Sequence, residues 1–151
     1  MASVSIRLAA ASERETLEAL QTRASLGNPG DREALLAHPD VNRIPEGQME
    51  AGRVFVAEED GTIIGFSVVL PRSDGDAELD GLFVEPERWR QGIGRHLVEH
   101  CEQVARLCGS TALHVVGNPH AEGFYAACGF THVGTVKLRF GIGLLFRKPL
   151  R

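Results

Sequence analysis

Two glycines and three arginines stand close together in one short stretch of the sequence. Gly92 and Gly94 lie at the start of an apolar repeat of helical spacing, and Arg88, Arg90 and Arg95 surround them. The first N–H groups of a helix have no partner within the helix, and the helix dipole is positive at that end. Glycines leave those N–H groups accessible to an anion. The stretch therefore predicts a phosphate-binding turn between a strand and a helix.

Two common phosphate-binding loops do not fit this stretch. The dinucleotide-binding fingerprint needs a third glycine at the position that Leu97 occupies. The Walker A loop needs Gly-Lys-Ser/Thr, and the chain has Gly94-Arg95-His96 there. A glycine-tolerant surface turn before an ordinary amphipathic helix is the structural alternative.

A second stretch carries the chain's only tyrosine on a predicted helix. Asn118 and Pro119 form a helix start, and Gly129 forms a helix stop. The apolar face between them holds Ala121, Phe124, Tyr125 and Cys128. A tyrosine hydroxyl has a reference pKa of about 10, so it stays protonated at neutral pH and can donate a proton. The alternative role of Tyr125 is packing in that apolar face.

Two carboxylates are candidates for the opposite task, which is to accept a proton. Glu78 and Asp80 point to the same side of a predicted strand, because residues two apart in a strand share a face. Either carboxylate could take a proton from an amine, directly or through a water molecule. The alternative is that both are solvated acidic side chains near Asp74 and Asp76.

One histidine pattern suggests a different chemistry. His96, Glu99 and His100 match the H-x-x-E-H pattern of inverted zinc peptidases. His96 and Glu99 project away from the apolar stripe of their helix, and no third ligand is evident. We expect no metal; the alternative function, a metallohydrolase, would require zinc bound at these residues.

The elements that must position these residues follow from periodicity and turn signals. Strands are predicted at residues 4–8, 53–59, 62–70, 77–84 and 112–116, with one or two more within 135–150. Helices are predicted after a capping box of Ser12 and Glu15, from 31 to 36, from 93 to 108 and from 118 to 128, with a loop at 39–52. Asp60-Gly61 predicts a hairpin turn. The helix at 93–108 makes its two flanking strands parallel.

Two helices have a predicted buried face. The first helix should bury Leu17, Leu20 and Ala24. The helix at 93–108 should bury Ile93, Leu97, Cys101, Val104 and Cys108. The length of 151 residues is usual for one domain, so we expect a single domain over residues 1–151.

Both informative stretches resemble motifs of the GNAT-type N-acetyltransferases. Val84-Glu85-Pro86 and Gly92-Ile93-Gly94 resemble the acetyl-CoA loop, in which Gln/Arg-x-x-Gly-x-Gly/Ala follows a strand that ends in Val-x-Pro. Trp89 replaces the first residue of that loop motif. The stretch from Asn118 to Phe130 resembles the family's Asn-x-x-Ala-x-x-Phe-Tyr-x-x-x-Gly-Phe motif at every named position. The resemblance covers residues 54–135.

The resemblance implies an α/β (α+β) GNAT fold, with a mixed, mostly antiparallel sheet, helices on both faces and a splayed central strand pair. It implies that backbone groups from Arg90 to Arg95 bind the pyrophosphate of acetyl-CoA. A backbone N–H near Leu82–Val84 would polarise the thioester carbonyl, and Asn118 would hold the pantetheine arm. The implied cofactor-binding residues are Leu82, Phe83, Val84, Trp89, Arg90, Gln91, Gly92, Ile93, Gly94, Arg95 and Asn118. The family binds the pyrophosphate mainly through backbone N–H groups, so the loop does not depend on the side chain that Trp89 replaces. Arg88 or Arg90 could replace the lost charge.

The resemblance also implies a mechanism. Tyr125 is the general acid for the coenzyme A thiolate. Some family members use a glutamate six residues before the valine of Val-x-Pro as the base, and here that residue is Glu78. The function is then transfer of an acetyl group from acetyl-CoA to a primary amine, by direct attack in a ternary complex. The alternative is a non-catalytic acyl-CoA-binding regulatory domain of the same fold.

Composition narrows the partners. The net charge of −4 and the sequence pI of about 5.9 argue against nucleic acid. No apolar run approaches the ~20 residues of a membrane span. Three cysteines without a CxxC motif, and a beginning without a signal-peptide core, indicate a reduced, cytoplasmic protein. The expected partners are acetyl-CoA and a small-molecule or peptide amine, and the apolar segment 138–146 could be an edge strand of a homodimer.

Overall fold

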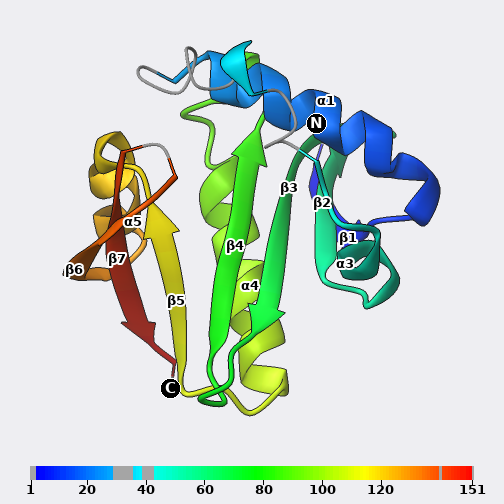
Figure 1. Cartoon of the computed structure of the whole chain (residues 1–151). Helices are drawn as coiled ribbons and strands as arrows, with labels where there is room; N and C mark the ends of the chain where they lie inside the picture. Colours follow the sequence, from blue (N-terminus) through cyan, green and yellow to red (C-terminus); the bar gives the residue numbers. More distant parts are fainter. Residues whose placement is uncertain (1–2, 29–35, 39–42, 140, 151) are drawn as a thin grey trace. The chain divides into compact units, whose positions relative to one another are not determined.

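The computed structural model describes residues 3–28, 36–38, 43–139 and 141–150. Seven strands form one sheet in the order β1-β2-β3-β4-β5-β7-β6 (Figure 1). The strands are β1 (Val4–Leu8), β2 (Val54–Glu59), β3 (Thr62–Pro71), β4 (Ala77–Val84), β5 (Ala112–Gly117), β6 (Thr131–Lys137) and β7 (Ile142–Pro149). β4 and β5 are parallel, whereas β2 pairs antiparallel with β1 and β3, and β7 with β5 and β6. The predicted mixed, mostly antiparallel sheet is confirmed.

Four α-helices that lie wholly within the described residues accompany these strands, and residues 36 and 37 are also helical. The four helices are α1 (Arg14–Leu26), α3 (Glu46–Glu50), α4 (Ile93–Leu107) and α5 (Glu122–Ala127). Short 3-10 turns lie before three of these helices. They are η1 (Ala11–Glu13) before α1, η3 (Pro86–Arg88) between β4 and α4, and η4 (Pro119–Ala121) before α5. No helix within the described ranges is long and apolar enough to cross a membrane.

The internal contacts divide the chain into two compact units. The first unit comprises residues 1–68 and 81–97, and the second comprises residues 69–80 and 98–151. β3, β4 and α4 therefore each contribute residues to both units. The organisation of the chain as a single domain stays a prediction.

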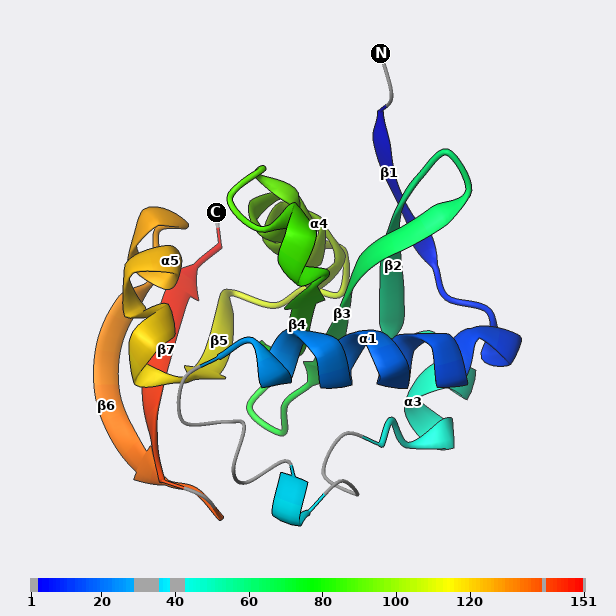
Figure 2. The same cartoon turned by 90° about the horizontal axis from the view of Figure 1, so that it is seen from above.

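In the first unit, β1, β2 and β3 form a meander that is covered by two helices. Asp60 and Gly61 turn β2 into β3 with φ values of 51° and 79°, which confirms the predicted hairpin. Ile93 and Leu97 of α4 form a buried cluster with Ala57 and Ile64. The predicted face of α1 is also buried, and α1 and the beginning of α4 lie on opposite faces of this part of the sheet (Figure 2).

The start of α1 differs from the prediction. Glu13, not Glu15, folds back: its carboxylate accepts a hydrogen bond from the Ala10 N–H at 2.8 Å and two from the Arg7 guanidinium at 2.9 and 2.8 Å. These bonds hold the pKa of Glu13 below its usual value, with Arg7 as the largest cause. The predicted capping box of Ser12 and Glu15 was wrong. Arg7, on β1, binds Glu13, which lies two residues before Glu15 and folds back in its place.

The segment between α1 and β2 is only partly comparable with its prediction. The helix predicted from 31 to 36 falls mostly outside the described residues. The loop predicted at 39–52 was wrong, since α3 lies within it and buries Met49. Two residues of α1 hold the chain before α3: Arg14 donates to the Ile44 carbonyl and Glu18 accepts from the Ile44 N–H, both at 2.6 Å. These long-range bonds outweigh the glycines that suggested a loop.

In the second unit, β5 lies between β4 and β7. The pairing of β4 with β5 covers Ala77–Leu79 and Leu113–Val115. The predicted helix after Asn118 begins with the turn η4, and α5 itself starts at Glu122. The outermost strand is β6, so the segment 138–146 does not form the edge; β7, which begins within it, is an inner strand. The use of this end of the sheet for a homodimer stays a prediction.

The C-terminal half of α4 corrects one core residue. Cys101 and Cys128 are buried as predicted, but Cys108 is exposed. The buried stripe of α4 runs through Val98, Cys101 and Ala105. Cys108 is exposed because the helix ends at Leu107 and Cys108 lies beyond it. Gly109 follows with φ +83°, the left-handed stop that the sequence predicts.

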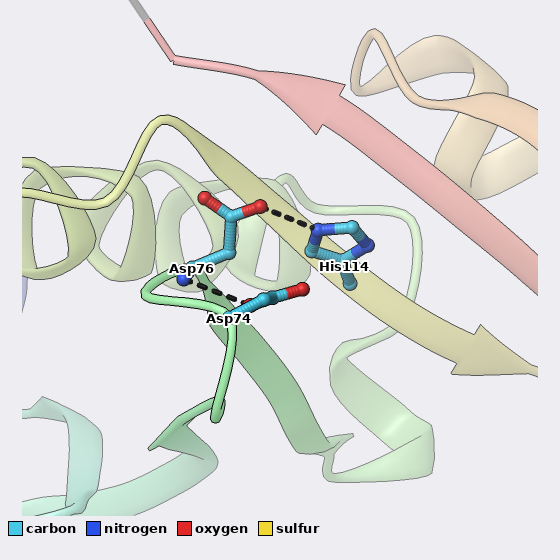
Figure 3. A group of neighbouring side chains, drawn as sticks. All are labelled: Asp74, Asp76 and His114. Atoms are coloured by element: carbon cyan, nitrogen blue, oxygen red, sulfur yellow. Dashed lines mark hydrogen bonds and ion pairs between the residues drawn. The ribbon is translucent and has the colours of Figure 1, made fainter.

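One carboxylate ties the β3–β4 turn to the beginning of β5. Asp76 Oδ1 accepts hydrogen bonds from the N–H and hydroxyl of Thr111, at 3.1 and 3.0 Å, and from the N–H of Ala112 at 3.1 Å. Its Oδ2 lies 3.0 Å from Nε2 of His114 (Figure 3). These contacts, with His114 first and Thr111 and Ala112 next, lower the pKa of Asp76 to about 2. The turn and β5 are thereby fixed in one register.

Replacing Asp76 tests this connection. Asp76→Ala removes the acceptor of three hydrogen bonds from Thr111 and Ala112, and we expect it to lower the free energy of unfolding at pH 7 by about 2 kcal/mol. The pKa of Asp76 is below its usual 3.8, so its stabilisation is complete above that pH and is lost as pH falls through about 2. Urea unfolding of both proteins should show their difference narrowing between pH 4 and pH 2. A constant difference over that range would contradict the assignment.

Candidate functional site

The loop between β4 and α4, in the first unit, has an unusual backbone. Arg90 and Gly92 adopt left-handed conformations with φ values of 64° and 84°. A positive φ is uncommon for a residue with a side chain, whereas glycine adopts it without strain. The N–H of His96 makes the first bond of α4, to the Gly92 carbonyl at 3.0 Å. The N–H groups of residues 93–95 therefore precede the internal bonds of the helix.

Arg88 braces this loop against the sheet. Its guanidinium makes two hydrogen bonds with the Glu59 carboxylate of β2, at 3.0 and 2.9 Å, and its Nε donates to Gln91 Oε1 at 2.9 Å. The bonds from Arg88 lower the pKa of Glu59. Both side chains are about three-quarters covered. Arg88 thus serves the loop itself, and Arg90, which is exposed, is the better source of charge for a ligand.

Trp89 is a second brace. Its indole N–H donates to the Val84 carbonyl at 2.8 Å, which joins the loop to the end of β4. The ring also packs on the end of α1, since a Cβ added to Gly27 would lie 2.9 Å from the ring. Arg23 of α1 makes two hydrogen bonds with Glu85, at 2.9 and 2.7 Å. Trp89, which departs from the family motif, therefore uses its indole N–H for a hydrogen bond within the protein.

The end of β4 is held on both of its faces. Leu82 and Val84 pack against the buried cluster around Ile93 and Leu97. Phe83 points the other way, and its ring lies 5.2 Å from that of Phe66. A Cβ on Gly65 would come within 2.9 Å of the Phe83 carbonyl, so only glycine fits there. These three residues of β4 lie beyond the stretch that pairs with β5.

Tyr125 lies in the second unit, in a cluster of aromatic rings. The ring centroids of Phe124, Phe130 and Phe146 lie 5.1, 5.6 and 5.2 Å from its own. Gly117, at the end of β5, lets the ring approach, because a Cβ there would lie 2.8 Å from Cε2 of Tyr125. Burial raises the pKa of Tyr125 above its usual value of 10. The hydroxyl therefore stays protonated well above neutral pH.

The two candidate bases share a face of β4, as predicted. Ala77 and Leu79 are buried on one side, and Glu78 and Asp80 point to the other. Glu78 forms an ion pair with Arg72 at 3.8 Å and lies opposite His114 in the sheet. Asp80 is exposed. Asn118 follows β5 directly, with an extended backbone, and its carbonyl accepts the Ala121 N–H at 2.9 Å.

The predicted site residues thus fall into two groups. The first unit holds the end of β4 and the braced loop, with Leu82, Phe83, Val84, Trp89, Arg90, Gln91, Gly92, Ile93, Gly94 and Arg95. The second unit holds Glu78, Asp80, Asn118 and Tyr125. Within each group the elements place the residues as the sequence predicts, and their roles stay predictions.

A group that the sequence did not reveal is Asp74, Asp76 and His114. Their potential ligand atoms all lie within 4.8 Å of one another, as metal ligands would (Figure 3). The oxygens of Asp76 already accept hydrogen bonds from four polar groups, and Asp74 forms an ion pair with Arg72 at 3.1 Å. We assign the group the structural role described above. No local pattern could reveal it, since Asp76 and His114 are 38 residues apart.

Of the pattern H-x-x-E-H, His96 and Glu99 are exposed, as predicted.

Comparison with known proteins identifies the family. The sequence pattern of the acetyltransferase (GNAT) family matches residues 18–130. The chain belongs to the GNAT acetyltransferase family. Phosphinothricin N-acetyltransferase from Alcaligenes faecalis is 31% identical over 119 residues, in a match that covers 68% of this chain. The chain spans 59% of the length of that relative.

Solved structures agree on the fold. A GCN5-related N-acetyltransferase from Rhodopseudomonas palustris has a TM-score of 0.80 at 20% identity, over 99% of this chain and 98% of that chain. An N-acetyltransferase from Thermoplasma acidophilum, solved in complex with coenzyme A, has a TM-score of 0.78 at 18% identity, over 97% and 99% of the two chains. The predicted GNAT fold is confirmed.

The brace at Trp89 can be measured directly. Trp89→Phe keeps a ring against α1 but removes the N–H that donates to Val84. The loss of one hydrogen bond should lower the free energy of unfolding by about 1 kcal/mol. Trp89→Ala, which also removes the packing of a ring that is 39% exposed, should cost more, about 2 kcal/mol. Urea unfolding followed by circular dichroism measures both, and a Phe variant as stable as the native protein would show that the hydrogen bond stabilises nothing.

Proposed function

We propose that this protein transfers the acetyl group of acetyl-CoA to the primary amine of a small-molecule or peptide acceptor. The observation that carries the proposal is the braced loop before α4, in a chain of the acetyltransferase family. Left-handed Arg90 and Gly92 lead into helix N–H groups that precede the first internal bond. A pyrophosphate is the anion that such a turn fits, because several N–H groups and the helix dipole converge on it.

The donor would be held by backbone groups of the first unit. The pyrophosphate would accept hydrogen bonds from N–H groups of residues 93–95, with the exposed Arg90 guanidinium nearby. The pantetheine arm would lie along Leu82–Val84, beyond the paired stretch of β4. Asn118 of the second unit is a proposed side-chain contact for the same arm. Trp89 would act by holding the loop and the Val84 carbonyl in place.

The chemistry needs two proton transfers. The amine nitrogen attacks the thioester carbonyl carbon, and a backbone N–H near Leu82–Val84 stabilises the negative charge on the oxygen. The C–S bond then breaks, and Tyr125 gives its proton to the departing thiolate. The amine loses its proton to a carboxylate of β4. The products are an N-acetyl amide and coenzyme A, with no covalent acyl-enzyme.

The position of the two carboxylates favours Asp80 as the nearer base. A strand rises about 3.3 Å per residue, so Asp80 is about 7 Å and Glu78 about 13 Å along the strand from Leu82. Glu78 also faces Arg72. We therefore propose Asp80 as the base nearer to Leu82 along the strand, and Glu78 as a base that would act through water.

The acceptor proposal starts from the relative. The enzyme from Alcaligenes faecalis is named for phosphinothricin, a small molecule with a primary amine. We propose phosphinothricin as the first acceptor to test, followed by a panel of amino acids, polyamines and peptide N-termini. Binding of acetyl-CoA without transfer to any of these amines would support the non-catalytic alternative.

The donor site is tested by Gly92→Glu. A glutamate there introduces bulk, negative charge and a strained left-handed backbone, so acetyl-CoA binding by calorimetry should weaken at least 100-fold. Gly75→Glu is the matched control: Gly75 is also left-handed, with φ +90°, and like Gly92 has open space where a Cβ would lie. It should bind as the native protein does. No binding by the native protein at high concentration would refute the proposed function.

The proton donor is tested by Tyr125→Phe. Removing a general acid should lower kcat about 100-fold while leaving the affinity for acetyl-CoA unchanged. Because burial raises the pKa of Tyr125, the native kcat should not fall through ionisation of this group as the pH rises to 10. Steady-state rates across that pH range measure both effects. A Phe variant with native kcat would show that Tyr125 only packs.

A further inference from the structure

One buried ion pair of the second unit is not used by the mechanism. Glu102 of α4 is 5% exposed, and its two carboxylate oxygens lie 3.0 and 3.1 Å from the Lys148 ammonium of β7. Arg106 approaches the same carboxylate at 3.6 Å. Lys148 also donates to the carbonyl of Cys128 at 2.8 Å. The ammonium therefore links α4, β7 and the residue that follows α5.

The carbonyl that Lys148 holds belongs to the end of the helix that carries Tyr125. The Phe130 N–H bonds to the Tyr125 carbonyl at 3.0 Å, and the Gly129 N–H bonds to the Ala126 carbonyl at 3.0 Å. Gly129 is left-handed with φ +92°. This is the Schellman arrangement, and the edge-to-face contact of Tyr125 with Phe130 is its usual apolar partner. Tyr125 is therefore one of the residues that define the helix end.

Lys148 complements this helix end in charge and in shape. A cation near the last carbonyls of a helix is favourable, because the helix dipole is negative there. The fit is close: a Cβ on Gly129 would lie 3.2 Å from Cε and 3.3 Å from Nζ of Lys148. A side chain at position 129 would push the ammonium away from the Cys128 carbonyl.

Stability alone is a weak reason for such a pair. Two charges lose hydration when they are buried, and apolar residues of similar size often stabilise a protein as well or better. What the pair adds is direction, since one ammonium is fixed by the two carboxylate oxygens and one carbonyl. The aromatic contacts of Tyr125 include Phe146 of β7, and the Glu102–Lys148 pair adds the connection from the end of α5 to α4.

We propose that the Glu102–Lys148 pair positions Tyr125 for proton donation. The inference rests on the proposed function, in which Tyr125 protonates the thiolate. Lys148 is a positioning residue: it fixes the end of α5, and the helix end fixes the direction of the Tyr125 hydroxyl. A displacement of about 1 Å in a reacting group can reduce a rate by up to 100-fold.

The test separates stability from activity. Lys148→Met leaves Glu102 buried with a weaker partner and should be destabilised. Glu102→Gln with Lys148→Met removes both charges, so the urea midpoint should return close to the native value. The Cys128 carbonyl still lacks its donor in that double variant, and kcat for phosphinothricin should stay 10- to 100-fold low, with KM for acetyl-CoA within twofold. Lys137→Met, at the chain's other lysine, on the exposed strand β6, is the matched control and should behave as native.

A second arm needs no acceptor. The chain has one tyrosine, so a protein labelled with ring-¹³C tyrosine gives the signals of Tyr125 alone. We expect these signals to shift or broaden in the Glu102→Gln, Lys148→Met variant and to stay in place in Lys137→Met. A third arm uses the acceptor again: in a Tyr125→Phe background, Lys148→Met should lower kcat no further, because both changes act on one proton transfer.

The outcomes distinguish two failures. If the doubly neutral variant regains both stability and native tyrosine signals, the pair is structural only and the positioning role is wrong. The same holds if Lys148→Met lowers kcat equally in the native and Tyr125→Phe proteins. If Tyr125→Phe itself turns over at the native rate, the proposed acid is wrong, and the positioning role fails with it.

Discussion

The first N–H groups of α4 can serve a ligand only if the loop before them keeps its shape without one. Three contacts of the first unit provide this: Arg88 with Glu59, Trp89 with the Val84 carbonyl, and Arg23 with Glu85. Each joins the loop or its approach to an element that is already packed. The strained backbone at Arg90 is thereby maintained by its surroundings, as is usual for strain at a functional site.

In the second unit, the corresponding constraint is the burial of Tyr125, the proposed proton donor. A tyrosine surrounded by aromatic rings cannot readily ionise, because a phenolate there would be poorly solvated. The same burial that disfavours the phenolate keeps Tyr125 protonated at neutral pH, which its proposed role as a proton donor requires. Packing and donation, which the sequence offered as alternatives, are therefore compatible in this environment.

Local patterns predicted much of the fold. The bounds of β1 and β4 agree with the prediction to the residue, and the Asp60-Gly61 turn and the strand-to-helix junction at Gly92 lie where glycine and proline signals placed them. What failed depends on distant partners. The helix start moved to Glu13 because Arg7 reaches it from β1, and α3 formed where Ile44 is held by α1. The same limit applies to the candidate site: its motifs are local, but the task of Trp89 depends on Gly27, which no spacing rule connects to it.

The replacement of a polar motif residue by Trp89 has one more consequence. It is the only tryptophan of the chain, and its indole lies where the loop before α4, the end of β4 and the end of α1 meet. Indole emission depends on the polarity around the ring and on the hydrogen bond of its N–H. The protein therefore carries an intrinsic fluorescent reporter at the centre of its loop, and changes in that loop can be followed by light without any added label.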